Sequence, residues 1–213
     1  WTWLLGGAVS MGVGIWSMHF IGMLAFHMGM PASYDAPLTL LSLLIGMGSS
    51  ALALWVISNH RLGHLDLLGG GIVMGAGIAA MHYTGMAAMH VDPPVTYSVP
   101  LVALSLLVAV LAATAAIWIA VSLATDTARW VLAKKAGSAL LVGLAICSMH
   151  YIGMAAATFA PHAAMSAAGH AHAFDARLMG VAIAVLSLLL LSLTLLVATV
   201  DARLASRAAD HAH

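Results

Sequence analysis

The sequence contains very little charge, no glutamate and a single cysteine. Only 7% of its 213 residues are Asp, Glu, Lys or Arg, whereas a soluble domain carries about 25%. A chain with so few charges cannot cover a water-facing surface, so lipid is expected to be its main solvent. The net charge of zero excludes the basic footprint of a nucleic-acid-binding protein. The lone Cys147 excludes an intrachain disulfide framework and a cysteine-based zinc site.

What the sequence has in abundance is apolar residues, which make up 63% of the chain. Six segments are long enough to cross about 30 Å of hydrocarbon, which takes about 20 residues. Their apolar runs are continuous rather than alternating, so we predict helices and not barrel strands. The fold class is therefore an all-α membrane protein with six transmembrane helices. The predicted spans are Leu4–Ala25, Leu38–Ile57, Leu67–Met89, Leu101–Ala124, Ala139–Phe159 and Leu178–Val200.

The basic residues predict how these helices are oriented. Six of the seven lie on one side of the predicted bundle, and only Arg177 lies on the other. By the positive-inside rule the basic side is cytoplasmic, so the opposite loops face the periplasm or the exterior. The six are Arg61, Arg129, Lys134, Lys135, Arg203 and Arg207.

An internal repeat organises the chain. A shift of 63 residues places His19 on His82, and a further shift of 68 places His82 on His150. Each unit is a pair of predicted helices, so successive units enter the membrane in the same direction and form tandem parallel repeats. The three histidines should therefore reach the same leaflet, the outer one.

The repeated motif reads SMHFIGM at residues 17–23, AMHYTGM at 80–86 and SMHYIGM at 148–154. Residues four apart share one face of a helix, so each motif presents an imidazole and a thioether one turn apart. Ionisable residues inside a membrane are costly and are functional candidates by default. The candidate metal ligands are His19, Met23, His82, Met86, His150 and Met154, with His27 and His90 extending the stripe outward in the first two units.

Imidazoles together with thioethers are the ligand set that favours copper, especially Cu(I). The membrane location supports the lower charge, because an ion held only by neutral ligands is harder to desolvate when it is divalent. A Cu(I) ion with an open coordination position could bind a diatomic gas. No Ser-His-Asp arrangement, phosphate-binding loop or carboxylate pair predicts catalysis within the chain.

Other interpretations remain open. The histidines could instead hydrogen-bond between helices and hold the bundle together. A copper transporter would use the stacked His and Met as a permeation ladder, and a haem-bearing electron carrier would use them as axial ligands. The loop that carries His162, Met165, His170 and His172 could capture copper or be a disordered connector. Gly12, Gly14, Gly75, Gly77 and Gly143 are expected to let helices pack closely.

The triplicated M-H-[YF]-x-G-M on alternate helices resembles the MHYT domain, a bacterial integral-membrane sensor domain. The resemblance covers nearly the whole chain, although only the second copy has the full Met81-His82-Tyr83-Thr84. It implies a sensor that binds copper and detects oxygen, carbon monoxide, nitric oxide or redox state. It also implies a signalling output on the cytoplasmic side, such as a cyclic-di-GMP enzyme or a kinase, and a place in the bacterial inner membrane with the motif ends of the helices facing the periplasm.

The resemblance also predicts how the chain is divided. Residues 1–200 are expected to form the sensor domain, and residues 201–213 a cytoplasmic tail that begins a linker to an output domain. The family is usually drawn with seven helices, so a further helix is expected before Trp1, where the chain starts without an initiator methionine.

Overall fold

Six long helices and three small sheets make up the described part of the chain, which comprises residues 2–26, 33–58, 63–124, 130–160, 164–165 and 173–210 of the computed structural model. All six helices are long and apolar enough to cross a membrane. The expected all-α membrane protein is thereby confirmed. The helices are α1 (Thr2–Ala25), α2 (Ala36–Ser58), α3 (His64–Ala87), α4 (Val99–Ala124), α5 (Val131–Ala156) and α6 (Ala176–Asp210).

Two helices are longer than their apolar runs. Helix α5 begins at Val131 rather than Ala139, because Lys134 and Lys135 interrupt the apolar run but are good helix formers. Helix α6 continues through residues 201–210, where the sequence predicted a tail. At the other ends, α3 stops at Ala87 and α5 at Ala156, two to three residues before the predicted limits.

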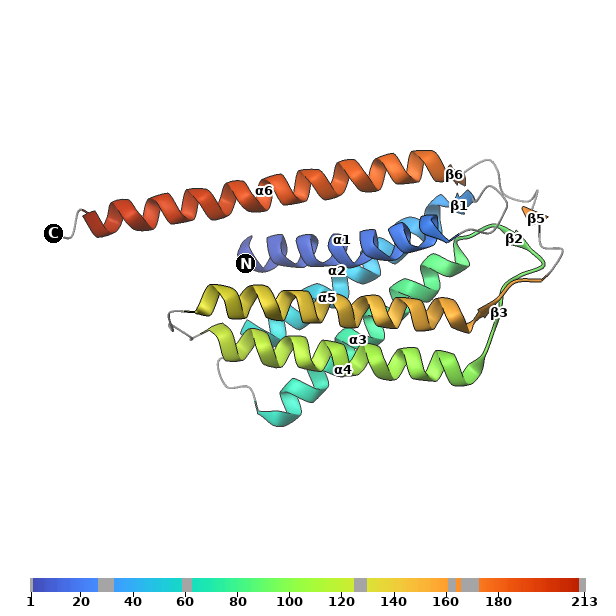
Figure 1. Cartoon of the computed structure of the whole chain (residues 1–213), viewed down its shortest axis with the longest axis horizontal. Coiled ribbons are helices and arrows are strands. Elements are labelled where there is room, and N and C mark those ends of the chain that lie inside the picture. Colours follow the sequence, from blue (N-terminus) through green and yellow to red (C-terminus); the bar gives the residue numbers. More distant parts are fainter. Residues whose placement is uncertain are drawn as a thin grey trace.

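Short strands join the loops at the end of the bundle where α1, α3 and α5 finish (Figure 1). All three pairs are antiparallel, and two of them involve the segment between α5 and α6 that was expected to be a connector. The residues His162, His170 and His172 of that segment lie outside the described residues. The pairs are β1 (Ser33–Asp35) with β6 (Ala173–Asp175), β2 (Val91–Asp92) with β5 (Ala164–Met165), and β3 (Thr96–Tyr97) with β4 (Ala157–Thr158).

The helices follow the repeat. Helices α1, α3 and α5 contact one another, while α2 packs against both α1 and α3, and α4 packs against both α3 and α5. Helix α6 follows the third motif helix as α2 and α4 follow the first two, but it packs mainly against α1 and lies along the outside of the bundle (Figure 1). Only 6% of its membrane-spanning window is buried, compared with 28% for α4.

Glycines set the distance between the paired helices. An added Cβ at Gly12 would lie 2.5 Å from the Met47 backbone, and one at Gly75 would lie 2.5 Å from the Val110 backbone. The two contacts are equivalent under the 63-residue repeat, so the packing role predicted for Gly12 and Gly75 is confirmed. A Cβ at Gly77 would clash with the Ser49 side chain, but nothing lies within 4 Å of the Cβ position at Gly14, where the prediction was wrong. Gly143 is the counterpart of Gly12 and Gly75 in α5, and nothing lies within 4 Å of its Cβ position.

This difference can be tested with matched substitutions. Gly75→Ala should lower the free energy of unfolding by about 1–3 kcal/mol, because the methyl group has no space between α3 and α4. Gly143→Ala should be neutral or stabilising, since alanine is a better helix former by about 1 kcal/mol. Thermal unfolding in detergent, followed by tryptophan fluorescence, measures both. Equal losses in the two variants would contradict this account of the packing.

Candidate metal centre

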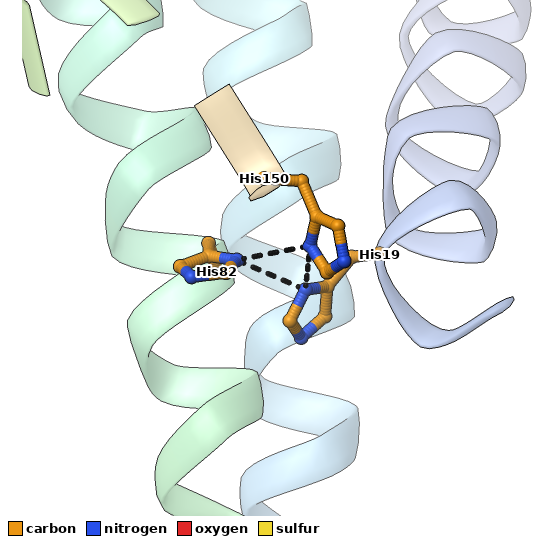
Figure 2. A group of neighbouring side chains, drawn as sticks. All are labelled: His19, His82 and His150. Atoms are coloured by element: carbon orange, nitrogen blue, oxygen red, sulfur yellow. Dashed lines mark hydrogen bonds between the residues drawn. The ribbon is translucent and has the colours of Figure 1, made fainter. Parts of the chain in front are cut away.

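The three motif histidines meet in the centre of the bundle. His19 comes from α1, His82 from α3 and His150 from α5, and their side chains are 0%, 0% and 1% exposed. Their Nδ1 atoms form a triangle with sides of 3.1 Å (His19–His82), 3.1 Å (His19–His150) and 3.3 Å (His82–His150) (Figure 2). We call these residues the histidine cluster. The convergence that the repeat predicted is therefore present.

Protons alone cannot satisfy this triangle. In a neutral imidazole Nδ1 either carries a proton and donates, or carries a lone pair and accepts. Each nitrogen of a three-membered ring has two neighbours, so at least one of the three contacts must join two donors or two acceptors. A cation at the centre removes the conflict, because all three nitrogens can then direct their lone pairs at it.

The size of the triangle suits a metal ion. Its centre lies about 1.8 Å from each Nδ1, close to the 2.0–2.1 Å of a metal–imidazole bond. Among the described residues, the three histidines are the only group of three or more His, Cys, Asp or Glu side chains that lie close enough to share a metal ion. The donor set is therefore three neutral nitrogens without a carboxylate, and positions above and below their plane are left for further ligands.

Each imidazole rests on a glycine of the next motif. A Cβ at Gly85 would clash with Nε2 of His19, one at Gly153 with Nε2 of His82, and one at Gly22 with Nε2 of His150. The contacts run around the three motif helices in one direction. The Nε2 atoms are buried and have no hydrogen-bond partner among the described residues. Each ring therefore packs directly against the backbone of a glycine, and these three glycines fix where the rings lie.

Helical spacing in the sequence did not mark these three glycines as part of the site. The glycines it singled out lie one to two turns before the histidines and serve packing between helices. The signal was present, because the glycine three residues after the histidine recurs in all three motifs: Gly22, Gly85 and Gly153.

Two apolar layers enclose the histidine cluster along the helices. One turn after each histidine lies a buried methionine, and one turn before each lies an isoleucine, each about 6 Å away along the helix. Both sets belong to or pack against the main core. The methionine layer consists of Met23, Met86 and Met154, and the isoleucine layer consists of Ile15, Ile78 and Ile146.

The other predicted ligands lie elsewhere. Helix α3 ends before His90, whose Nδ1 lies 3.4 Å from the Ser33 hydroxyl in β1. His90 is therefore not part of the histidine cluster. His27 lies outside the described residues. Tyr83 bonds to Ser105 of α4 over 2.7 Å, whereas the equivalent Tyr151 is 65% exposed, so neither tyrosine hydrogen-bonds the cluster.

The strand end of the bundle closes over the methionine layer. Tyr34 of β1 is fully buried, stacks edge-on against Phe20 and pairs with Met89. Burial raises the pKa of the Tyr34 phenol to about 12, so it remains neutral at physiological pH. The buried residues Tyr34, Phe20 and Met89, which we call the strand cap, therefore form an uncharged layer between the cluster and this end of the bundle.

Comparison with known proteins agrees with this architecture. The profile of the MHYT family, described as "Bacterial signalling protein N terminal repeat", matches residues 12–70 and 75–133. The chain belongs to the MHYT family. The first match contains the second half of α1 and all of α2, and the second match contains the second half of α3 and all of α4. The third copy of the motif lies outside both.

Curated relatives are bacterial signalling proteins. The chain is 48% identical to the bifunctional diguanylate cyclase/cyclic di-GMP phosphodiesterase MucR of Pseudomonas aeruginosa over 97% of its length. It is 45% identical to the cyclic di-GMP phosphodiesterase NbdA of the same organism over 73%, and 38% identical to the signaling protein YkoW of Bacillus subtilis over 74%. It spans only 30%, 20% and 20% of these relatives. No solved structure matches the chain.

The MHYT chain is thus a membrane signalling domain, as the motif predicted. The catalytic activities in the relatives' names belong to proteins of which this chain covers less than a third.

The contact between the imidazole rings and the glycines generates a prediction. Gly85→Ala should displace the His19 ring and open the Nδ1 triangle, because the new methyl group occupies the place of Nε2. Overpacking of this kind costs about 1–3 kcal/mol of stability and should also change the ring environment. Imidazole resonances of 15N-histidine-labelled protein measure the displacement. Gly69→Ala on the same helix, where nothing lies within 4 Å, is the control and should leave the resonances unchanged.

Proposed function

We propose that this chain is a membrane sensor domain that holds one copper ion, as Cu(I), on the histidine cluster. The supporting observation is the Nδ1 triangle, with sides of 3.1–3.3 Å and no carboxylate among its described ligand groups. Its size fits a metal–imidazole site. Because it has three nitrogens, at least one nitrogen–nitrogen contact cannot be a hydrogen bond unless a cation is bound. Bound there, copper would supply a redox-active centre with room for a further ligand.

The chemistry around the triangle favours copper in the monovalent state. The site is buried and its histidines are neutral ligands, so an ion of higher charge would pay a larger desolvation cost. Soft thioethers select Cu(I) over zinc, and three of them form the methionine layer one turn away. We therefore propose that the methionine layer offers soft ligands to the copper ion, and that one of its thioethers would complete the ligand set. The layer consists of Met23, Met86 and Met154.

The alternatives fit the geometry less well. A haem needs space for a macrocycle between its axial ligands, but the three Nδ1 atoms lie within 3.3 Å of one another. A copper-permeation path needs ligands through the depth of the membrane, but the next layer inward is built from isoleucines. The sensor is therefore the function that the site supports best.

The signal is proposed to be a diatomic gas (oxygen, carbon monoxide or nitric oxide) or a change of redox state at the copper. Any such ligand must bind one arrangement of the bundle more tightly than another to shift its population. The cyclic-di-GMP enzymes among the relatives suggest an output of that kind in cis, or a kinase or similar partner in trans.

The charges support an orientation. Lys134 and Lys135 near the start of α5 and Arg203 near the end of α6 lie at the end opposite the strands, and Arg177 lies at the strand end (Figure 1). Arg61 and Arg129 lie outside the described residues. By the positive-inside rule, the strand cap and the motif ends face the periplasm. The bacterial relatives support a place in the bacterial inner membrane.

Metal analysis of the purified protein tests the proposal. The wild-type chain, loaded anaerobically with Cu(I) and desalted, should retain about one copper ion per chain and show no Soret band. His82→Ala should lose the ion, because two imidazoles and a cavity replace the triangle. His90→Ala is the matched control on the same segment and should retain it.

Replacing the methionine layer separates its role from that of the imidazoles. The triple variant Met23→Leu, Met86→Leu and Met154→Leu keeps the volume of the layer but removes the sulfur atoms. It should keep the fold and lower the affinity for Cu(I) by about 10–100-fold, because the ion loses its thioether ligand while the three imidazoles still hold it. Competition with a chromophoric Cu(I) chelator measures this. Full metal retention in His82→Ala would refute the site.

A further inference from the structure

On the side facing α6, no outer helix packs closely across the gap between α1 and α5 beside the histidine cluster. A cavity of about 510 Å³ lies between α1, α5 and α6. His150 forms part of its wall, together with Gly22, on which the His150 ring rests. The cavity therefore ends at one of the three imidazoles that form the Nδ1 triangle.

The repeat explains why the cavity is on this side. Tyr34, Tyr97 and Phe174 lie two residues before α2, α4 and α6 respectively, which aligns the three outer helices. Twelve and sixteen residues later, α2 has Gly46 and Ser50 and α4 has Ala109 and Ala113, whereas α6 has Leu186 and Leu190. Small residues let α2 and α4 lie close to the motif helices. The two leucines keep α6 at a distance.

A single polar contact illustrates how α6 is held. The Ser187 hydroxyl donates to the Ser17 hydroxyl of α1 over 3.3 Å, and both residues line the cavity. Helix α6 is thus attached on its α1 side and does not pack extensively against α5. Two residues of the cavity wall, Ile21 of α1 and Tyr151 of α5, are 54% and 65% exposed, so the cavity opens on the surface of the membrane-spanning helices.

The routes along the bundle axis are filled. Toward the strands, the methionine layer and the fully buried Phe20 and Tyr34 cover the cluster. In the opposite direction lies the isoleucine layer, with Ile15 6% and Ile78 2% exposed. The side facing α6, by contrast, has a cavity whose wall includes the His150 side chain, which is itself only 1% exposed.

The wall of this cavity selects for uncharged molecules. The described residues that line it include no Asp, Glu, Lys or Arg, and its polar groups are hydroxyls, the Cys147 thiol and the His150 ring. An ion would lose its hydration there without gaining a partner, whereas a small apolar molecule dissolved in lipid would not.

We propose that the cavity between α1, α5 and α6 is the entrance through which a small uncharged molecule dissolved in the bilayer reaches the histidine cluster at His150. This inference rests on the proposed function in one respect, namely that the cluster holds the metal to which such a molecule binds. The entrance itself is a property of the protein and can be tested without metal.

The single cysteine is a built-in reporter of the entrance. In proteoliposomes of the whole chain, uncharged N-ethylmaleimide should label Cys147, and a charged methanethiosulfonate present on both sides should not. Ser187→Phe fills the cavity and should slow maleimide labelling on the order of tenfold. Leu188→Phe, at the next position of α6 and 64% exposed, should leave the rate unchanged. Equal labelling by the charged reagent, or no effect of Ser187→Phe, would overturn the inference.

The copper-loaded protein then distinguishes the two proposals. If wild-type protein retains copper, carbon monoxide should bind with a C–O infrared band, and Ser187→Phe should slow its binding on the order of tenfold without lowering the copper content. Unchanged binding rates would overturn the entrance and leave the metal site standing. A wild-type chain that retains no copper would overturn the proposed function, and the labelling result would still decide the entrance.

Discussion

The structure depends on the contact between an imidazole ring and the backbone of a neighbouring helix. Three rings can share one centre only if the helices that carry them approach more closely than ordinary side chains permit. At each of the three points of contact the facing residue is a glycine, and a single methyl group would occupy the place of Nε2. The glycines that allow the helices to approach closely therefore also determine the geometry of the site. Small residues commonly serve close approach between membrane helices, and here they also determine where nitrogen atoms lie.

This constraint explains why much of the fold could be predicted and where prediction stopped. The apolar runs and the 63-residue repeat predicted six helices and the convergence of His19, His82 and His150, because symmetry requires equivalent residues of parallel units to lie at the same depth. Helix ends were less predictable. Lys134 and Lys135 continue a helix although they end an apolar run, and α6 continues past the membrane-spanning window for the same reason. Hydropathy describes the solvent around a segment, whereas backbone geometry decides where the helix ends.

The finer features of the site could not be obtained from spacing alone. Helical periodicity placed His90 on the stripe of His82 and Met86, but α3 ends at Ala87 and a strand pairing redirects the chain toward Ser33. Periodicity also could not show which atom of each ring points inward. The role of Gly22, Gly85 and Gly153 depends on contacts between different repeats, and such contacts become visible only when the three helices are placed together. The same holds for the off-centre position of α6, which follows from leucines at positions where the other outer helices have small residues.

Helix α6 differs from the other five in running 35 residues without interruption. Its apolar window ends at Val197, and the remaining turns to Asp210 extend it by about 20 Å. An unbroken helix behaves as a stiff rod, so a small tilt or rotation beside the cavity is carried undiminished to its far end. The first turns of α6 are held by the β1–β6 pairing and by the buried Met179 and Ile183, so the displacement of its far end grows with distance from that attachment.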